Sequence, residues 1–168
     1  MIRHAALVAA LALGACASAP TAGAPAKVDN AGLIDRYDTP ALRSIIADLG
    51  YAITDFGESS SGKPMMEVDT KDGLSFRVLG ENCDGEGKNQ VCTGVQLSTQ
   101  FGESDADLDE IMARANRTLR PAKVFRVDAG LAYERYLIMD GGVSRENLKT
   151  EIEVFVEILG GLQKQING

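Results

Sequence analysis

The sequence has no tryptophan and a single histidine, and these scarcities weigh against several kinds of function. The histidine, His4, lies in an N-terminal segment that we predict to be removed, which leaves the mature chain with none. Triad hydrolysis most often uses histidine as its general base, and zinc sites need clustered histidine or cysteine. A Gly-rich phosphate loop and a dinucleotide fingerprint are also lacking. We therefore predict no catalytic centre, metal site or cofactor; a hydrolase built on paired carboxylates stays open as a minor alternative.

Positive charge is also in short supply. Against 24 acidic residues stand 17 basic ones, so the formal net charge is -7. An acidic surface repels phosphate backbones and anionic lipid head groups. We expect no nucleic acid among the partners, and we expect membrane contact only through an anchor.

The N-terminus has the layout of a secretory signal peptide. A short basic stretch precedes an apolar run from Ala5 to Ala15, which is too short for a bilayer crossing of about 20 residues. The run ends in Leu13-Gly14-Ala15-Cys16, which resembles the bacterial lipobox, in which the cysteine becomes the lipidated N-terminus. We predict residues 1–15 as the signal peptide and Cys16 as the lipidation site. Ala17 rather than Asp follows the cysteine, which favours the outer membrane; cleavage near Ala17 to release a soluble periplasmic protein is the alternative.

The remaining chain divides into a tether and one domain. Residues 16–38 are dominated at first by Ala, Pro, Gly and Thr, with only Leu33-Ile34 apolar, a composition typical of a flexible tether. Residues 39–168 form the domain. It contains two cysteines, Cys83 and Cys92, and in an oxidising compartment an even count of two predicts one disulfide bridge.

Hydrophobic periodicity predicts nine elements in the order α-β-β-β-β-α-β-β-α. Three helices are expected to begin at the N-caps Thr39, Ser104 and Ser144. Alternation and turn signals predict strands over 51–59, 65–70, 74–81, 91–101, 122–128 and 133–139. Because several strands follow one another without intervening helices, we predict an α+β fold in which an antiparallel sheet is flanked by helices.

The chain from Thr39 to Ile166 resembles the YbjN-like family, labelled bacterial sensory transduction regulators. The resemblance rests on dispersed segments: 45–51, the Cys83/Cys92 segment, 116–125 and 141–144. It implies a fold similar to type III secretion chaperones, an antiparallel sheet flanked by helices that binds segments of other proteins. The chain departs from the family pattern at Ala115 and Pro121, where an aromatic residue and a phenylalanine are common. The candidate binding residues lie in the third segment: Asn116, Arg120 and Lys123.

These patterns together predict an exported, non-enzymatic binding domain. The expected partner is another protein, which an adaptor or chaperone-like module would capture as an extended or helical segment at a sheet edge or in a helix groove. A periplasmic sensor of a small ligand or ion, with a pocket between sheet and helices, is the alternative.

Overall fold

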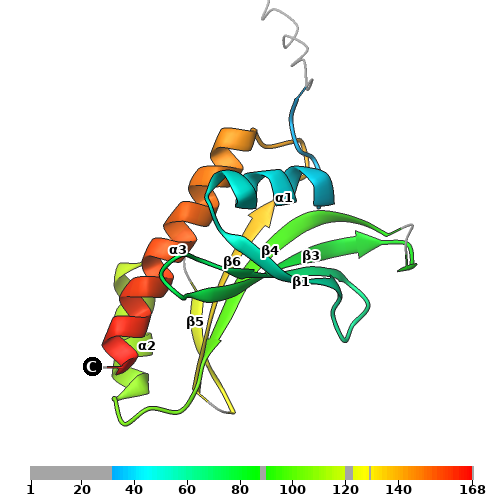
Figure 1. Ribbon diagram of the computed structural model, residues 1–168. Coiled ribbons are helices and arrows are strands. Elements are labelled where there is room, and N and C mark those ends of the chain that lie inside the picture. The colour runs from blue at the N-terminus through cyan, green and yellow to red at the C-terminus, as the bar shows by residue number, and fades with distance from the viewer. Residues whose placement is uncertain (1–31, 88–89, 120–122, 129, 168) are drawn as a thin grey trace, which may run out of the picture.

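The computed structural model describes residues 32–87, 90–119, 123–128 and 130–167, and it shows an α+β fold (Figure 1). The predicted signal peptide, Cys16 and most of the predicted tether lie outside these ranges. The predicted fold class and element order are confirmed. The helices are α1 (Thr39–Asp48), α2 (Leu108–Thr118) and α3 (Arg145–Asn167). The strands are β1 (Ala52–Glu58), β2 (Pro64–Asp69), β3 (Ser75–Asp84), β4 (Val91–Phe101), β5 (Lys123–Val127) and β6 (Gly130–Ile138).

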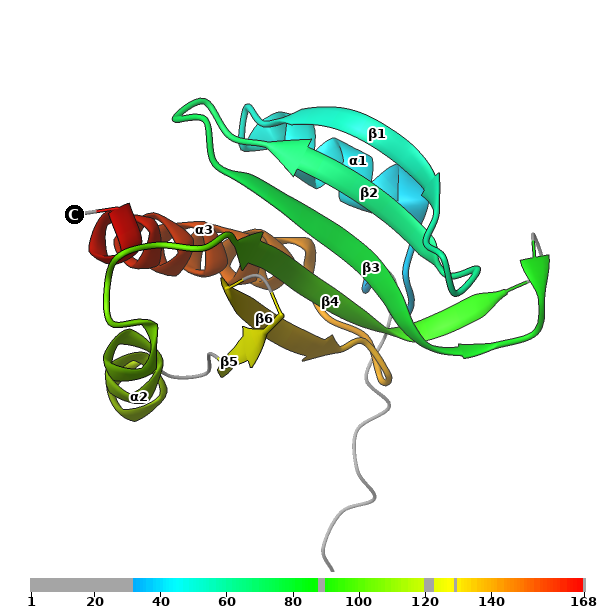
Figure 2. The same ribbon diagram turned by 90° about the horizontal axis from the view of Figure 1, so that it is seen from below.

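The strands form a six-stranded sheet in the order β1-β2-β3-β4-β6-β5, and every neighbouring pair is antiparallel. The first four strands are successive neighbours, so they form an antiparallel meander. α1 and α3 lie on one face of the sheet, and α2 packs beside α3 and β5 (Figures 1 and 2). No helix in the described ranges covers the opposite face, which is turned toward the viewer in Figure 2.

The core lies between the sheet and the helices. Alternate side chains of β2, β3 and β4 are buried there, as Val68, Val78 and Leu97 illustrate with 0% exposure. From α3 the predicted apolar stripe meets them, and the Phe155 ring stacks on Tyr133 at 4.5 Å between centroids. Burying one such side chain stabilises the fold by about 1.5–3 kcal/mol. The stripe consists of Leu148, Ile152, Phe155, Leu159, Leu162 and Ile166.

The folded domain begins before the predicted boundary at Thr39. Ile34 pairs with Val143 through two backbone hydrogen bonds of 2.9 and 3.0 Å. Tyr37 is 9% exposed, and its amide donates to the carbonyl of Cys92 at 2.8 Å. Residues 32–38 therefore belong to the domain and not to the tether. Their composition gave no sign of this, because the surface that covers Tyr37 and part of Ile34 comes from distant parts of the chain.

Two of the three predicted N-caps are wrong. α1 is capped by Asp38, whose side chain accepts a hydrogen bond from the amide of Ala41, while Thr39 is already helical. α2 is capped by Asp107 rather than Ser104. Asp, Ser and Thr all cap well, so a chain with several of them in a row does not reveal which one acts.

The third predicted cap, Ser144, is correct: its hydroxyl accepts from the amide of Asn147 at 3.1 Å. Ser104 has another role, because its hydroxyl donates to the carbonyl of Ile166 and so joins the start of the α2 region to the end of α3.

The predicted disulfide is also present. Cys83 and Cys92 are directly opposite each other on β3 and β4, nine residues apart in sequence. Closing so short a loop stabilises the fold by about 2–3 kcal/mol in the chain-entropy model. None of the helices in the described ranges is long and apolar enough to cross a membrane.

Candidate functional site

Of the three predicted binding residues, one has a structural role, one is exposed, and one lies outside the described ranges. Asn116 uses its carboxamide on the backbone of Val124: its Oδ1 accepts from the Val124 amide at 2.9 Å and its Nδ2 donates to the Val124 carbonyl at 2.7 Å. These two hydrogen bonds hold β5 against α2, so the role of Asn116 is structural. Lys123 is exposed, and its ammonium lies 4.7 Å from the ring centre of Phe125. Arg120 lies outside the described residues.

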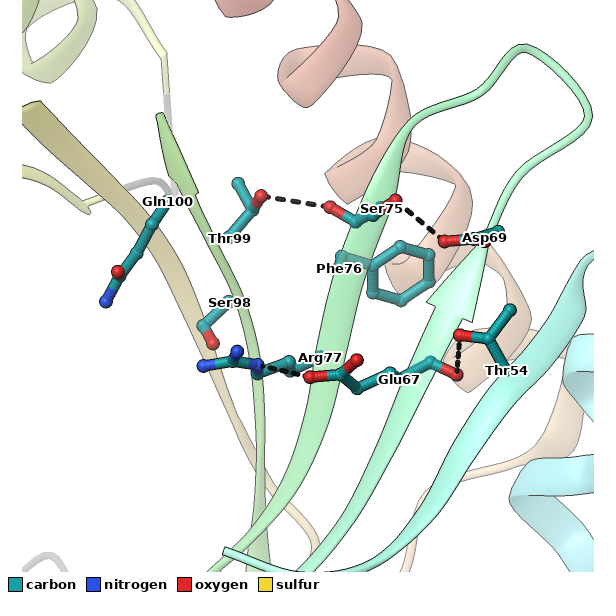
Figure 3. A pocket seen from close by; sticks show the side chains of 9 residues that line it. All are labelled: Thr54, Glu67, Asp69, Ser75, Phe76, Arg77, Ser98, Thr99 and Gln100. Atoms are coloured by element: carbon teal, nitrogen blue, oxygen red, sulfur yellow. Dashed lines mark hydrogen bonds and ion pairs between the residues drawn. The ribbon is translucent and has the colours of Figure 1, made fainter. Parts of the chain in front are cut away.

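A polar groove of about 360 Å³ crosses the uncovered face of the sheet (Figure 3). Its charged side chains already have polar partners: Arg77 forms an ion pair with Glu67 at 3.1 Å, and the Ser75 hydroxyl donates to Asp69 at 2.7 Å. Phe76, which also lines the groove, is 3% exposed and so presents no ring to a ligand. The groove is therefore an open, polar sheet surface whose charged side chains are already hydrogen-bonded. Its lining residues are Thr54, Glu67, Asp69, Ser75, Phe76, Arg77, Ser98, Thr99 and Gln100.

The free end of β6 is a different kind of surface. β5 is paired with β6 as far as the pair Lys123 and Glu134, whereas β6 stays paired with β4 as far as Ile138. Within the described ranges, residues 135–138 therefore have a strand neighbour on one side only. An edge strand presents backbone N–H and C=O groups that another strand can pair with. Tyr136 and Ile138, with exposures of 51% and 67%, are the most exposed large apolar side chains among the described residues.

A groove of about 280 Å³ runs between this edge and the first turns of α3, and we call it the β6 groove. Its wall is mainly apolar, with polar groups from Arg135, Asn147 and Glu151. The apolar members are Tyr136, Leu137, Ile138, Met139, Val143 and Leu148.

Arg135 gives the β6 groove its chemistry. The side chain is 7% exposed, and its Nη2 donates to the carboxylate of Glu151. The other two guanidinium nitrogens, Nε and Nη1, are buried without an acceptor among the described residues. A buried donor that makes no hydrogen bond lowers the stability of the fold by about 1–3 kcal/mol. A ligand that offers an acceptor to these two nitrogens would remove that cost.

The hydroxyl of Tyr133, two residues earlier on the same strand, is also buried without a partner among the described residues. Burial lowers the pKa of Arg135, and the neighbouring Tyr133 partly opposes that shift. Burial raises the pKa of Tyr133, and the Arg135 cation partly offsets it. In the polar groove of Figure 3 the charged side chains have polar partners, whereas the β6 groove contains a buried cation with two donors that have no acceptor in the described part of the chain. The second arrangement is the one that can still gain hydrogen bonds from a ligand.

In the described part of the chain, no three side chains of the His, Cys, Asp or Glu type lie close enough together to hold a metal ion. No protein-family model, curated protein sequence or solved structure matches the chain. The resemblance to the YbjN-like family thus stays a prediction from the sequence.

The sequence predicts a strand over residues 133–139 but assigns no role to Arg135, Tyr136 or Ile138. One signal was available. Arg135 is two residues from both Tyr133 and Leu137, so it shares their face of the strand. That face is the buried one, where an arginine is rarely found unless it is paired. The exposure of Tyr136 and Ile138 could not be predicted, because it depends on how far β5 extends along β6.

Proposed function

We propose that the protein is an exported, lipid-anchored, non-enzymatic adaptor that captures an extended segment of another protein at the free end of β6. The observation that carries this proposal is the stretch 135–138, which has a strand neighbour on one side only among the described residues, and where Tyr136 and Ile138 are exposed beside an apolar groove. The proposal includes the chaperone-like fold type and the YbjN-like family. A six-stranded antiparallel sheet with helices on one face agrees with both.

The mechanism is strand addition. A segment that lies along residues 135–138 gains main-chain hydrogen bonds, each with a net contribution of about 0.5–1.5 kcal/mol. Alternate side chains of the segment point to opposite sides, so every second one enters the β6 groove. The backbone thus supplies affinity, and the groove selects the side chain.

The alternative, a sensor for a small ligand, has weaker support. At about 280 Å³ the β6 groove is slightly smaller than the pockets of about 300–1,000 Å³ that enclose drug-sized ligands. The polar groove, at about 360 Å³, is large enough, but its charged side chains are already hydrogen-bonded to neighbouring side chains. A groove of the smaller size suits one or two side chains of a longer chain.

Site-specific photo-crosslinking in the native cells tests the proposal. A photoreactive amino acid is placed at position 136, 138 or 91 of the full-length protein; Val91, which is 40% exposed on the β3–β4 hairpin, is the matched apolar control. We expect positions 136 and 138 to crosslink one protein at residues two apart in one segment, because added strands run in register. Position 91 should not capture that segment.

Two outcomes contradict the proposal. Crosslinks from positions 136 and 138 to many different proteins would mean that the β6 edge binds proteins non-specifically. Equal capture of the same segment at position 91 would mean that the β6 edge is not the binding surface.

A further inference from the structure

The floor of the β6 groove indicates the kind of segment that it accepts. Arg135 is a buried cation whose charge is balanced by Glu151, yet two of its nitrogens have no acceptor among the described residues. A partner that supplies an acceptor oxygen would relieve a cost that the free protein carries. The next question is whether that oxygen is charged.

A neutral oxygen suits Arg135 better than a carboxylate. The Glu151 carboxylate already neutralises the guanidinium, so a second carboxylate would bring an unbalanced negative charge into a poorly solvated groove. Burying an unbalanced charge costs far more than burying a hydrogen-bonded carbonyl. Main-chain carbonyl groups are the acceptors that an added strand offers at every residue.

Close to the groove the acidic side chains are partly balanced, because Glu151 is paired with Arg135 and Glu134 lies opposite Lys123 on β5. The chain as a whole nevertheless has a net charge of -7, which gives it a negative field. A segment with basic residues on its flanks would be attracted by this field, and the attraction would weaken as salt is added.

We propose that the β6 groove binds an internal, extended peptide segment that inserts an apolar side chain, gives a main-chain carbonyl oxygen to Arg135, and carries basic flanking residues. The Arg135 side chain rotates, while Nη2 keeps its contact with Glu151, until Nε or Nη1 reaches that oxygen. This inference rests on the proposed function and adds the chemistry of the partner to it.

Nuclear magnetic resonance with defined peptides provides the test. The probe is the capped peptide N-acetyl-Lys-Val-Leu-Val-Lys-amide, titrated into the 15N-labelled full-length chain carrying Cys16→Ser. We expect the amide signals of residues 135–138 and the Nε–H signal of Arg135 to shift together. A peptide N-methylated at its central leucine keeps the side chains but loses a ladder donor, and it should bind at least ten-fold more weakly.

Two further peptides examine charge. The same sequence with Glu in place of both Lys residues should bind about ten-fold more weakly at low salt, and the difference should vanish near 1 M salt. N-acetyl-Lys-Val-Leu with a free carboxylate should bind no better than its amide. If the free acid binds more than ten-fold tighter than the amide, the groove is a carboxylate site and the inference is wrong.

A pair of double variants separates binding from folding. Replacing a buried ion pair by apolar residues is often neutral for stability, so Arg135→Met/Glu151→Met should keep the fold while it loses about ten-fold in peptide affinity. Arg77→Met/Glu67→Met removes the pair on the uncovered face and should leave affinity unchanged. The protein's amide spectrum reports that each variant is folded.

The two proposals fail in different ways. If position 138 crosslinks a defined segment in cells but the Arg135→Met/Glu151→Met variant binds peptide as the unaltered chain does, strand addition stands and the role of Arg135 is wrong. Edge amides that shift while the Arg135 Nε–H signal stays fixed lead to the same conclusion. If the peptides shift neither set of signals and position 138 captures no defined segment, both proposals are wrong.

Discussion

At the scale of single residues, two buried tyrosines connect packing with pH. Tyr133 stacks on Phe155, and its hydroxyl has no partner among the described residues, whereas the Tyr37 hydroxyl donates to the carbonyl of Val78 at 3.4 Å. Burial raises the pKa of both phenols. An unfolded tyrosine ionises near pH 10, so above that pH the unfolded chain releases protons that the folded chain retains. The stability from these neutral phenols is complete below pH 10 and is lost as the pH rises further.

We expect Tyr133→Phe to leave the free energy of unfolding at pH 7 unchanged or to raise it by about 1 kcal/mol. The substitution removes a buried hydroxyl that makes no hydrogen bond and keeps the stacked ring. It should also reduce the loss of stability between pH 9 and pH 11. Urea denaturation at pH 7, 9 and 11 measures both effects.

Tyr37→Phe serves as the control, because it removes a hydroxyl that does have an acceptor. Its free energy of unfolding at pH 7 should fall by about 0.5–1.5 kcal/mol. If Tyr133→Phe lowers the free energy of unfolding by more than 1 kcal/mol, the Tyr133 hydroxyl forms a hydrogen bond in solution. The statement that this hydroxyl has no partner would then be wrong.

At the scale of elements, the sequence predicted the order of helices and strands because each carries a local signal. The α3 stripe repeats at helical spacing, and the β3 residues Phe76 and Val78 alternate with polar ones. Cap positions were less predictable, since Asp38 and Thr39 are neighbours of similar capping strength. The free end of β6 was not predictable, because within the described ranges it depends on β5 being shorter than β6, which no local pattern of β6 records.

The segment 32–38 behaves as an element of the domain, and its contribution can be measured. We expect a chain that begins at Thr39 to unfold with a free energy about 2–4 kcal/mol lower than a chain that begins at Gly32. Burial of Tyr37 contributes about 1.5–3 kcal/mol and the Asp38 cap about 1 kcal/mol. Urea denaturation of the two chains gives the difference.

Asp38→Ala in the longer chain isolates the cap and should lower the free energy of unfolding by about 1 kcal/mol. Equal stabilities of the chains that begin at Gly32 and Thr39 would restore the boundary predicted from the sequence and place 32–38 with the tether.

At the scale of the whole molecule, the groove lies close to the point where the chain enters the domain. Ile34 pairs with Val143, and Val143 also lines the β6 groove, so the described part of the chain begins near the proposed binding surface. The chain between Cys16 and Gly32 can span at most about 50–60 Å. If Cys16 carries the predicted lipid, the β6 groove stays within that range of the membrane, and partners there meet it at a high effective concentration.

The lipid is therefore the whole-molecule prediction on which this arrangement depends. We expect radiolabelled palmitate to enter the full-length protein in its native cells and not the Cys16→Ser variant, because the acyl chains attach at that cysteine. The unaltered protein should fractionate with the outer membrane, since Ala17 follows the cysteine, and the variant should lose the lipid that holds the protein there. Cys83 and Cys92 are bonded to each other, so they offer no competing thiol. Equal labelling of both forms, or none in either, would mean that Cys16 is not lipidated. The domain would then meet its partner as a freely diffusing protein, without the concentration effect of a shared membrane.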